Sequence, residues 1–108
     1  MKNSPSPPKA VSTEAKRWWR AIQVEFEIND PGGLAILACA AKAFDRMREA
    51  QALIKSQGMT TSDRFGQVKT HPAVLIERDS RSQILAALKQ LNLDVEPLNE
   101  RPGRPNGR

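Results

Sequence analysis

An alanine-rich apolar segment over residues 34–57 constrains the fold more than any other feature of the sequence. Its apolar side chains recur at spacings of three and four, which is the period of an α-helix and not of a β-strand. Two stripes share this period: Leu34, Leu37, Ala38, Ala41 and Phe44, and Ile36, Ala40, Ala43, Met47, Ala50 and Ile54. A first half that is apolar almost all round predicts a central helix with neighbours on several sides.

Helical spacing also predicts a helix on each side of this segment. The first is expected over about residues 13–28, capped by Ser12 or Thr13. The third begins near Pro72 and ends at about Asn92, which suits a left-handed helix cap.

The break between the first and second helices falls at residues 29–33. Asp30 is a suitable N-cap and Pro31 a suitable first helical residue. Whether Gly32 and Gly33 belong to the helix or to a short loop stays open. Gly58 is expected to end the second helix, because glycine adopts left-handed backbone without a steric penalty.

Residues 59–71 lose the helical period and carry Gly66, which suits a turn with positive φ. Two strands alone are marginal in water, so this element is expected to lean on something. The expected fold is therefore mainly α: a three-helix core with a long central helix, a short β-hairpin or irregular finger between the second and third helices, and flexible termini.

The charge lies at the two ends of the chain. The net charge of +5 divides into +4 over residues 1–20, −1 over 21–96 and +2 over 97–108. We therefore expect a flexible basic proline-rich arm over residues 1–11, a helical oligomerisation and DNA-binding domain over 12–96, and a basic Pro/Gly-rich tail over 97–108. Basic terminal arms favour a polyanion as partner, nucleic acid first, although charged ends also serve solubility alone.

The candidate DNA-binding residues lie in these two basic regions. They are Lys9, Lys16, Arg17 and Arg20 at the arm and first helix, and Arg101, Arg104 and Arg108 in the tail. Such cations suit phosphate contacts that carry no sequence preference.

Four apolar side chains on the first helix form a candidate oligomer interface. They are Trp18, Trp19, Ile22 and Phe26, which share one helix face. Core packing is the simpler interpretation of the tryptophan pair. The alternative is that one ring packs on another subunit or stacks on a base beside Arg17 and Arg20. A chain of 108 residues buries a limited fraction of its surface, which favours self-association.

The sequence offers no catalytic residues, no metal site and no cofactor. The chain has one His and one Cys, 32 positions apart, and no phosphate-binding glycine loop. A Cys39–His71 pair is disfavoured, because the apolar run around Cys39 predicts a buried thiol whose charged form would be poorly solvated. His71 is interpreted as a helix-entry residue, with a phosphate or base contact as the alternative. No stretch approaches the roughly 20 apolar residues that cross a bilayer, so no membrane partner is expected.

The order of the segments resembles the small subunit of phage terminases. The resemblance covers about residues 5–108: AKRWWRAIQVEFE, then AILACAAKAFDRMREAQALIKSQG, then a polar finger with Gly66, then KTHPAVLIERDSRSQILAALKQLNL. His71-Pro72-Ala73 and Leu91-Asn92-Leu93 match its helix start and its close. Asn92 stands where the family usually has Gly, and the proline near the close is displaced to Pro97.

The resemblance implies a non-enzymatic subunit that forms a homo-oligomeric ring in the host cytoplasm. It further implies binding to double-stranded viral DNA and delivery of that DNA to the large terminase subunit, which carries the ATPase and nuclease. The alternative is a small helical DNA-binding regulator that acts as a dimer.

Overall fold

A computed structural model describes residues 5–92 of the chain. Its elements are α1 (Thr13–Glu25), α2 (Pro31–Gln57), β1 (Thr60–Ser62), β2 (Val68–Thr70) and α3 (Pro72–Gln90). The expected fold class is confirmed: three helices dominate, the central one is the longest, and a two-stranded antiparallel hairpin separates α2 from α3. The open choice between a hairpin and an irregular finger is thereby resolved in favour of the hairpin.

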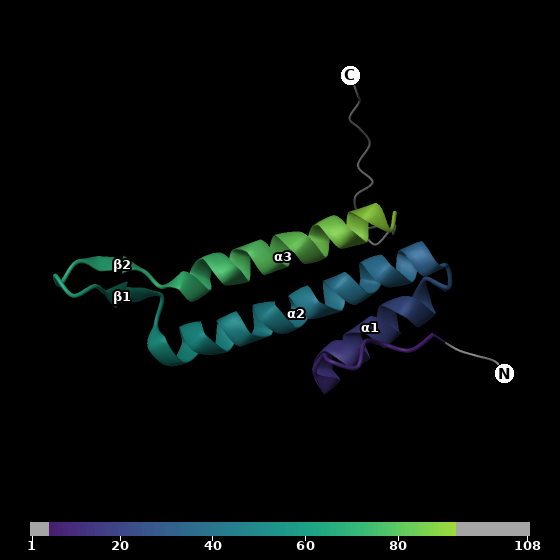
Figure 1. Cartoon of the computed structure of the whole chain (residues 1–108), viewed down its shortest axis with the longest axis horizontal. Coiled ribbons are helices and arrows are strands. Elements are labelled where there is room, and N and C mark those ends of the chain that lie inside the picture. Colours follow the sequence, from purple (N-terminus) through teal and green to yellow (C-terminus); the bar gives the residue numbers. More distant parts are fainter. Residues whose placement is uncertain (1–4, 93–108) are drawn as a thin grey trace, which may run out of the picture.

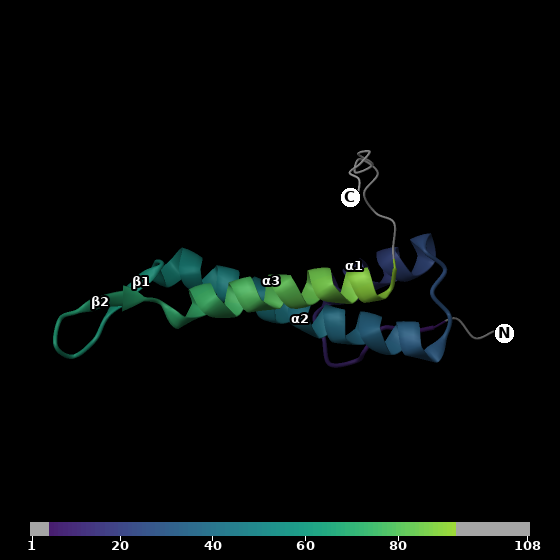
Figure 2. The same ribbon diagram turned by 90° about the horizontal axis from the view of Figure 1, so that it is seen from above.

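Helices α2 and α3 lie side by side and run in opposite directions, as Figures 1 and 2 both show. The residues that they bury are mostly small: Ala40, Ala43, Ala50, Ala73, Ser80 and Ala87, together with Ile84. Small side chains allow two helix backbones to approach closely and to bury their surfaces without voids. The pair therefore forms a flat layer whose length is that of α2, about 40 Å for 27 residues.

Helix α1 packs on the first half of α2 and forms a second part of the core. Trp19, Ala15 and Val11 are buried there with Ile28, Leu37 and Ala41. Val11, at the end of the expected arm, therefore belongs to this core. Residues 5–11 form neither helix nor strand.

Helix α1 ends three residues before the expected position at residue 28. Phe26 is the C-cap, and Glu27 adopts a positive φ of 52°. The Ile28 amide then donates to the Gln23 carbonyl at 3.1 Å, and the Glu27 amide donates to the Val24 carbonyl at 3.3 Å. This pattern reverses the chain at the helix end and brings the Ile28 side chain into the core. The prediction was wrong because no glycine or asparagine marks the left-handed residue.

Helix α2 begins at Pro31, so Gly32 and Gly33 are both helical, which resolves the second open choice. Asp30 is the N-cap and accepts the Gly33 amide at 2.7 Å. A Cβ at Gly33 would lie 2.8 Å from Asp30 Oδ1 and 2.9 Å from Ile28 Cγ2. Glycine at this position therefore lets the segment before α2, with Ile28 and Asp30, pack closely against the first turn of the helix.

The hairpin extends beyond the adjoining ends of α2 and α3 in both views (Figures 1 and 2). Thr60 pairs with Thr70, Thr61 with Lys69 and Ser62 with Val68. Every residue of both strands is exposed. Within residues 5–92 the helices do not cover the strands of the hairpin.

Replacing each of the two early glycines of α2 by alanine is expected to have opposite effects. Gly33→Ala should lower the free energy of unfolding by about 1–3 kcal/mol, because its Cβ overlaps Asp30 and Ile28. Gly32→Ala should raise it by about 0.5–1 kcal/mol, because the site is open and alanine is the better helix former. Urea denaturation at equal protein concentration measures both, and a destabilised Gly32→Ala variant would contradict the assignment.

Candidate nucleic-acid interface

Three of the expected DNA-binding cations share one exposed face of α1. Lys16, Arg17 and Arg20 lie on the side of the helix turned away from the buried residues Ala15 and Trp19. With Pro7 of the arm and Val24 they line an open groove of about 580 Å³. We call Lys16, Arg17 and Arg20 the cationic stripe. One acidic residue, Glu25, lines the same groove at the far end of the helix.

The charges of the cationic stripe are not neutralised within the described chain. Among residues 5–92, neither the stripe nor Lys9 makes an ion pair or a side-chain hydrogen bond. Four other cations do make ion pairs: Arg48, Lys69, Arg78 and Arg81. The stripe is therefore the place on α1 where positive charge is available to an external anion. The other three expected DNA-binding residues, Arg101, Arg104 and Arg108, lie outside the described residues.

The aromatic face of α1 divides between core and surface. Trp19 is 1% exposed and fills the core of a single chain, so it has almost no surface to offer a second subunit. Trp18 stacks on Phe44 of α2, with ring centroids 5.3 Å apart and planes inclined by 20°. Ile22 and Phe26 are half-buried against the same cluster. Core packing, the simpler interpretation of the tryptophan pair, therefore describes Trp19.

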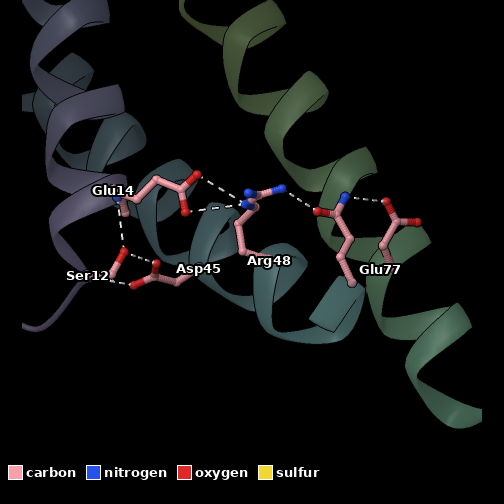
Figure 3. A network of polar contacts seen from close by, with 7 residues as sticks. Ser12, Glu14, Asp45, Arg48 and Glu77 are labelled. Carbon is pink, nitrogen blue, oxygen red and sulfur yellow. Dashed lines mark hydrogen bonds and ion pairs between the residues drawn. The ribbon is translucent and has the colours of Figure 1, made fainter. Parts of the chain in front are cut away.

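A network of polar contacts fixes α1 relative to the other two helices (Figure 3). Asp45 of α2 accepts two hydrogen bonds from Ser12, one from its amide at 2.7 Å and one from its hydroxyl at 2.5 Å. Ser12 in turn accepts the Ala15 amide at 3.0 Å and so caps α1. The start of α1, and the stripe that follows it, are thereby held against α2.

The network continues across α2 to α3 (Figure 3). Arg48 pairs with Glu14 of α1, with Nε 3.2 Å from Oε2, and donates to Gln51 at 2.7 Å. Gln51 donates to Glu77 of α3 at 3.3 Å. These contacts are exposed or half-buried, so each contributes modestly to stability. Together they specify how the three helices are placed.

The hairpin tip is organised by Asp63. Its Oδ1 accepts the amides of Phe65 at 2.8 Å and Gln67 at 3.0 Å, while its Oδ2 lies 3.5 Å from Lys69 Nζ. Gly66, with φ of 80°, closes the turn by donating to the Asp63 carbonyl at 3.0 Å. The amide of Gln67 is the largest cause that holds the pKa of Asp63 below 3.8, and the Phe65 amide and Lys69 act in the same direction.

The structure shows the surroundings of His71 and Cys39, which the sequence singled out. His71 caps α3, since its Nδ1 accepts the Ala73 amide at 3.0 Å and its Nε2 lies 2.7 Å from Gln57 Oε1. Both ring nitrogens are engaged within the chain, which supports the interpretation of His71 as a capping residue and not as a phosphate contact.

Cys39 is exposed, although a buried thiol was expected. The apolar first half of α2 has neighbours on the sides of α1 and α3, and Cys39 faces neither.

No helix within residues 5–92 is long and apolar enough to cross a membrane. No group of three or more His, Cys, Asp or Glu side chains in the same residues is placed to hold a metal ion.

A family model for the phage terminase small subunit matches residues 15–96, which include the hairpin, α2, α3 and all of α1 except its first two residues. The chain therefore belongs to the phage terminase small subunit family, and its general role lies in phage genome packaging. No curated protein and no solved structure matches the chain.

Asp45→Ala is expected to loosen α1. Removing the acceptor of both Ser12 hydrogen bonds should lower the free energy of unfolding by about 1–2 kcal/mol. Asp79→Ala is the matched control, because Asp79 is exposed and its carboxylate lies 3.8 Å from Arg78 on the same helix. It should change stability by less than about 0.5 kcal/mol. Equal effects of the two substitutions in urea denaturation would show that the Ser12–Asp45 contact has no special role.

Acid is expected to open the hairpin tip. Because folding lowers the pKa of Asp63, the stabilisation by its carboxylate is complete above the unfolded value and is lost as pH falls through the folded value. The amide resonances of Phe65 and Gln67 should therefore shift together, with a midpoint below 3.8. Asp63→Asn should abolish this titration. A shared midpoint above 3.8 would contradict the assigned contacts.

Proposed function

We propose that the chain is a non-catalytic, homo-oligomeric adaptor that binds double-stranded viral DNA and delivers it to the large terminase subunit in the host cell. Membership of the terminase small subunit family supports the packaging role. The observation that carries the DNA contact is the cationic stripe: three cations in one open groove of α1, without acidic partners among residues 5–92.

Lys9 and the stripe contact phosphate oxygens in this proposal, and Arg101, Arg104 and Arg108 of the tail add further contacts. Three side chains on one helix face reach only a few phosphates, so a single chain binds weakly. An assembly repeats the stripe in each copy and raises the overall affinity without any new kind of contact. The exposed edges of Trp18, Ile22 and Phe26 supply apolar surface for such an assembly, whereas Trp19 is internal.

The arrangement of the helices favours this adaptor over a dimeric helix-turn-helix regulator. Helices α2 and α3 are joined by residues 58–71, which include the hairpin, and not by a tight turn. They also lie antiparallel along one another, so neither projects from the body as a recognition helix (Figure 1). An assembly larger than about four subunits in light scattering supports the adaptor, and a dimer supports the regulator.

Removing the stripe is expected to weaken DNA binding and flatten its salt dependence. The variant Lys16→Ala, Arg17→Ala, Arg20→Ala loses up to three phosphate contacts per chain. The slope of log K against log salt should then fall by up to about 3 per bound chain. The readout is fluorescence anisotropy with a labelled duplex between about 50 and 200 mM salt.

The matched control carries Lys55→Ala, Arg78→Ala and Lys89→Ala, which removes the same charge from exposed positions away from α1. It should reduce binding far less than the stripe variant. Equal losses for the two variants would mean that net charge alone governs binding, and the stripe would not be the contact.

A further inference from the structure

The finger, by which we mean residues 59–70, exposes three large apolar side chains. Phe65 is 77% exposed, Val68 71% and Met59 64%. A two-stranded hairpin is marginal on its own in water, and this one has no support from the helices. Both features indicate that a partner covers the finger.

The tip of the finger combines an aromatic ring with one available cation. The Arg64 guanidinium lies 5.1 Å from the centre of the Phe65 ring. The other charges of the finger are used internally, because Asp63 and Lys69 pair with each other. A surface with one available cation and three exposed apolar side chains suits an acidic protein groove better than a phosphate backbone, which is bound by several cations.

The same chain carries a groove with the complementary chemistry. It lies between the end of the arm and α2, has a volume of about 510 Å³, and is lined by Ala10 and Ala52 together with three carboxylates and one cation, Arg48. Two of the carboxylates are engaged: Glu14 pairs with Arg48, and Asp45 accepts from Ser12. Glu49 is exposed and makes no ion pair or side-chain hydrogen bond among residues 5–92. We call this depression the arm groove.

A finger does not reach the arm groove of its own chain. Glu49 lies eight residues before the end of α2, which corresponds to about 12 Å along the helix axis. The finger points beyond that end, away from the arm, in both views (Figures 1 and 2). The two complementary surfaces therefore meet only between different copies.

We propose that the finger of one copy docks in the arm groove of the next, with Arg64 paired to Glu49 and Phe65 packed on Ala10 and Ala52. This inference rests on the proposed function, since it specifies the contact through which the adaptor assembles. Its occupant is a second copy of this chain, chosen by the charge complementarity between Arg64 and Glu49. DNA is the alternative occupant that the experiment separates.

A charge reversal on each side, and then on both, tests the contact. Arg64→Glu and Glu49→Arg should each weaken self-association of the full chain by at least about tenfold, because like charges then face each other. The double variant should restore self-association to within about threefold of the wild type, because the pair is re-formed with opposite polarity. Sedimentation velocity over a concentration series measures all of these, and circular dichroism checks that helix content is unchanged.

Two further variants separate packing and net charge from the specific pair. Phe65→Ala should weaken self-association without a charge change, since an exposed aromatic anchor is removed. Arg78→Glu carries the same charge change as Arg64→Glu on an exposed residue of α3, and should leave self-association as in the wild type.

The proposal is overturned if both single charge reversals self-associate as the wild type does. It is also overturned if the double variant does not regain self-association. Loss of duplex affinity in Arg64→Glu with unchanged stoichiometry identifies DNA as the occupant and also overturns it. Neither outcome touches the proposed function while the wild type assembles and binds duplex through the stripe. If the wild type stays monomeric and does not bind duplex DNA at low salt, the finger contact and the proposed function are both overturned.

Discussion

The close packing of α2 on α3 through small side chains is the constraint on which the rest of the structure depends. Alanines from both helices, with Ser80 of α3, allow the two backbones to lie side by side along most of α2. A flat pair of helices has two ends, and each end is used differently. The finger leaves from one end, and α1 covers the part of α2 near the other end (Figure 1).

Helix α1 depends on that layer for its position and presents two faces of opposite character. Trp19 and Ala15 bury one face against α2, while the cationic stripe occupies the other. Because Asp45 holds Ser12, the first turn of α1 is fixed just where the basic arm enters. A displacement of α1 would therefore move the core and the stripe together, which couples stability to the presentation of charge.

The sequence predicts those features that depend on local spacing. The apolar period predicted three helices, and His71-Pro72 predicted the start of α3. Asp30-Pro31 indicated a possible start of α2, but the sequence left open whether Gly32 and Gly33 are helical. The end of α1 was missed because Glu27, and not a glycine, adopts the left-handed conformation. The exposure of Cys39 was missed because the period shows that a segment is apolar, but not how many neighbours cover it.

The candidate site likewise contains features that local spacing predicts and contacts that it does not predict. The stripe follows from the positions of Lys16, Arg17 and Arg20 on a helix, and a local signal for the hairpin tip existed in the spacing of Asp63 and Gly66. The anchor between Ser12 and Asp45 carried no local signal, because the two residues are 33 positions apart. The arm groove likewise forms only when the arm meets α2. Contacts between distant segments depend on tertiary packing, and the spacing of residues in one sequence does not show which segments meet.

The proposed contact between copies is heterologous, since a finger and an arm groove are different surfaces. In this proposal each added copy would fill one groove and leave another open, so growth would end where the rotation between neighbours closes a ring. In a closed ring every finger would be covered, which would remove the exposed Phe65 from water and support a hairpin that is marginal alone. The same rotation repeats the cationic stripe at a fixed interval around the assembly. The geometry of one hairpin contact would thereby set the spacing at which successive stripes meet the phosphate backbone of a duplex.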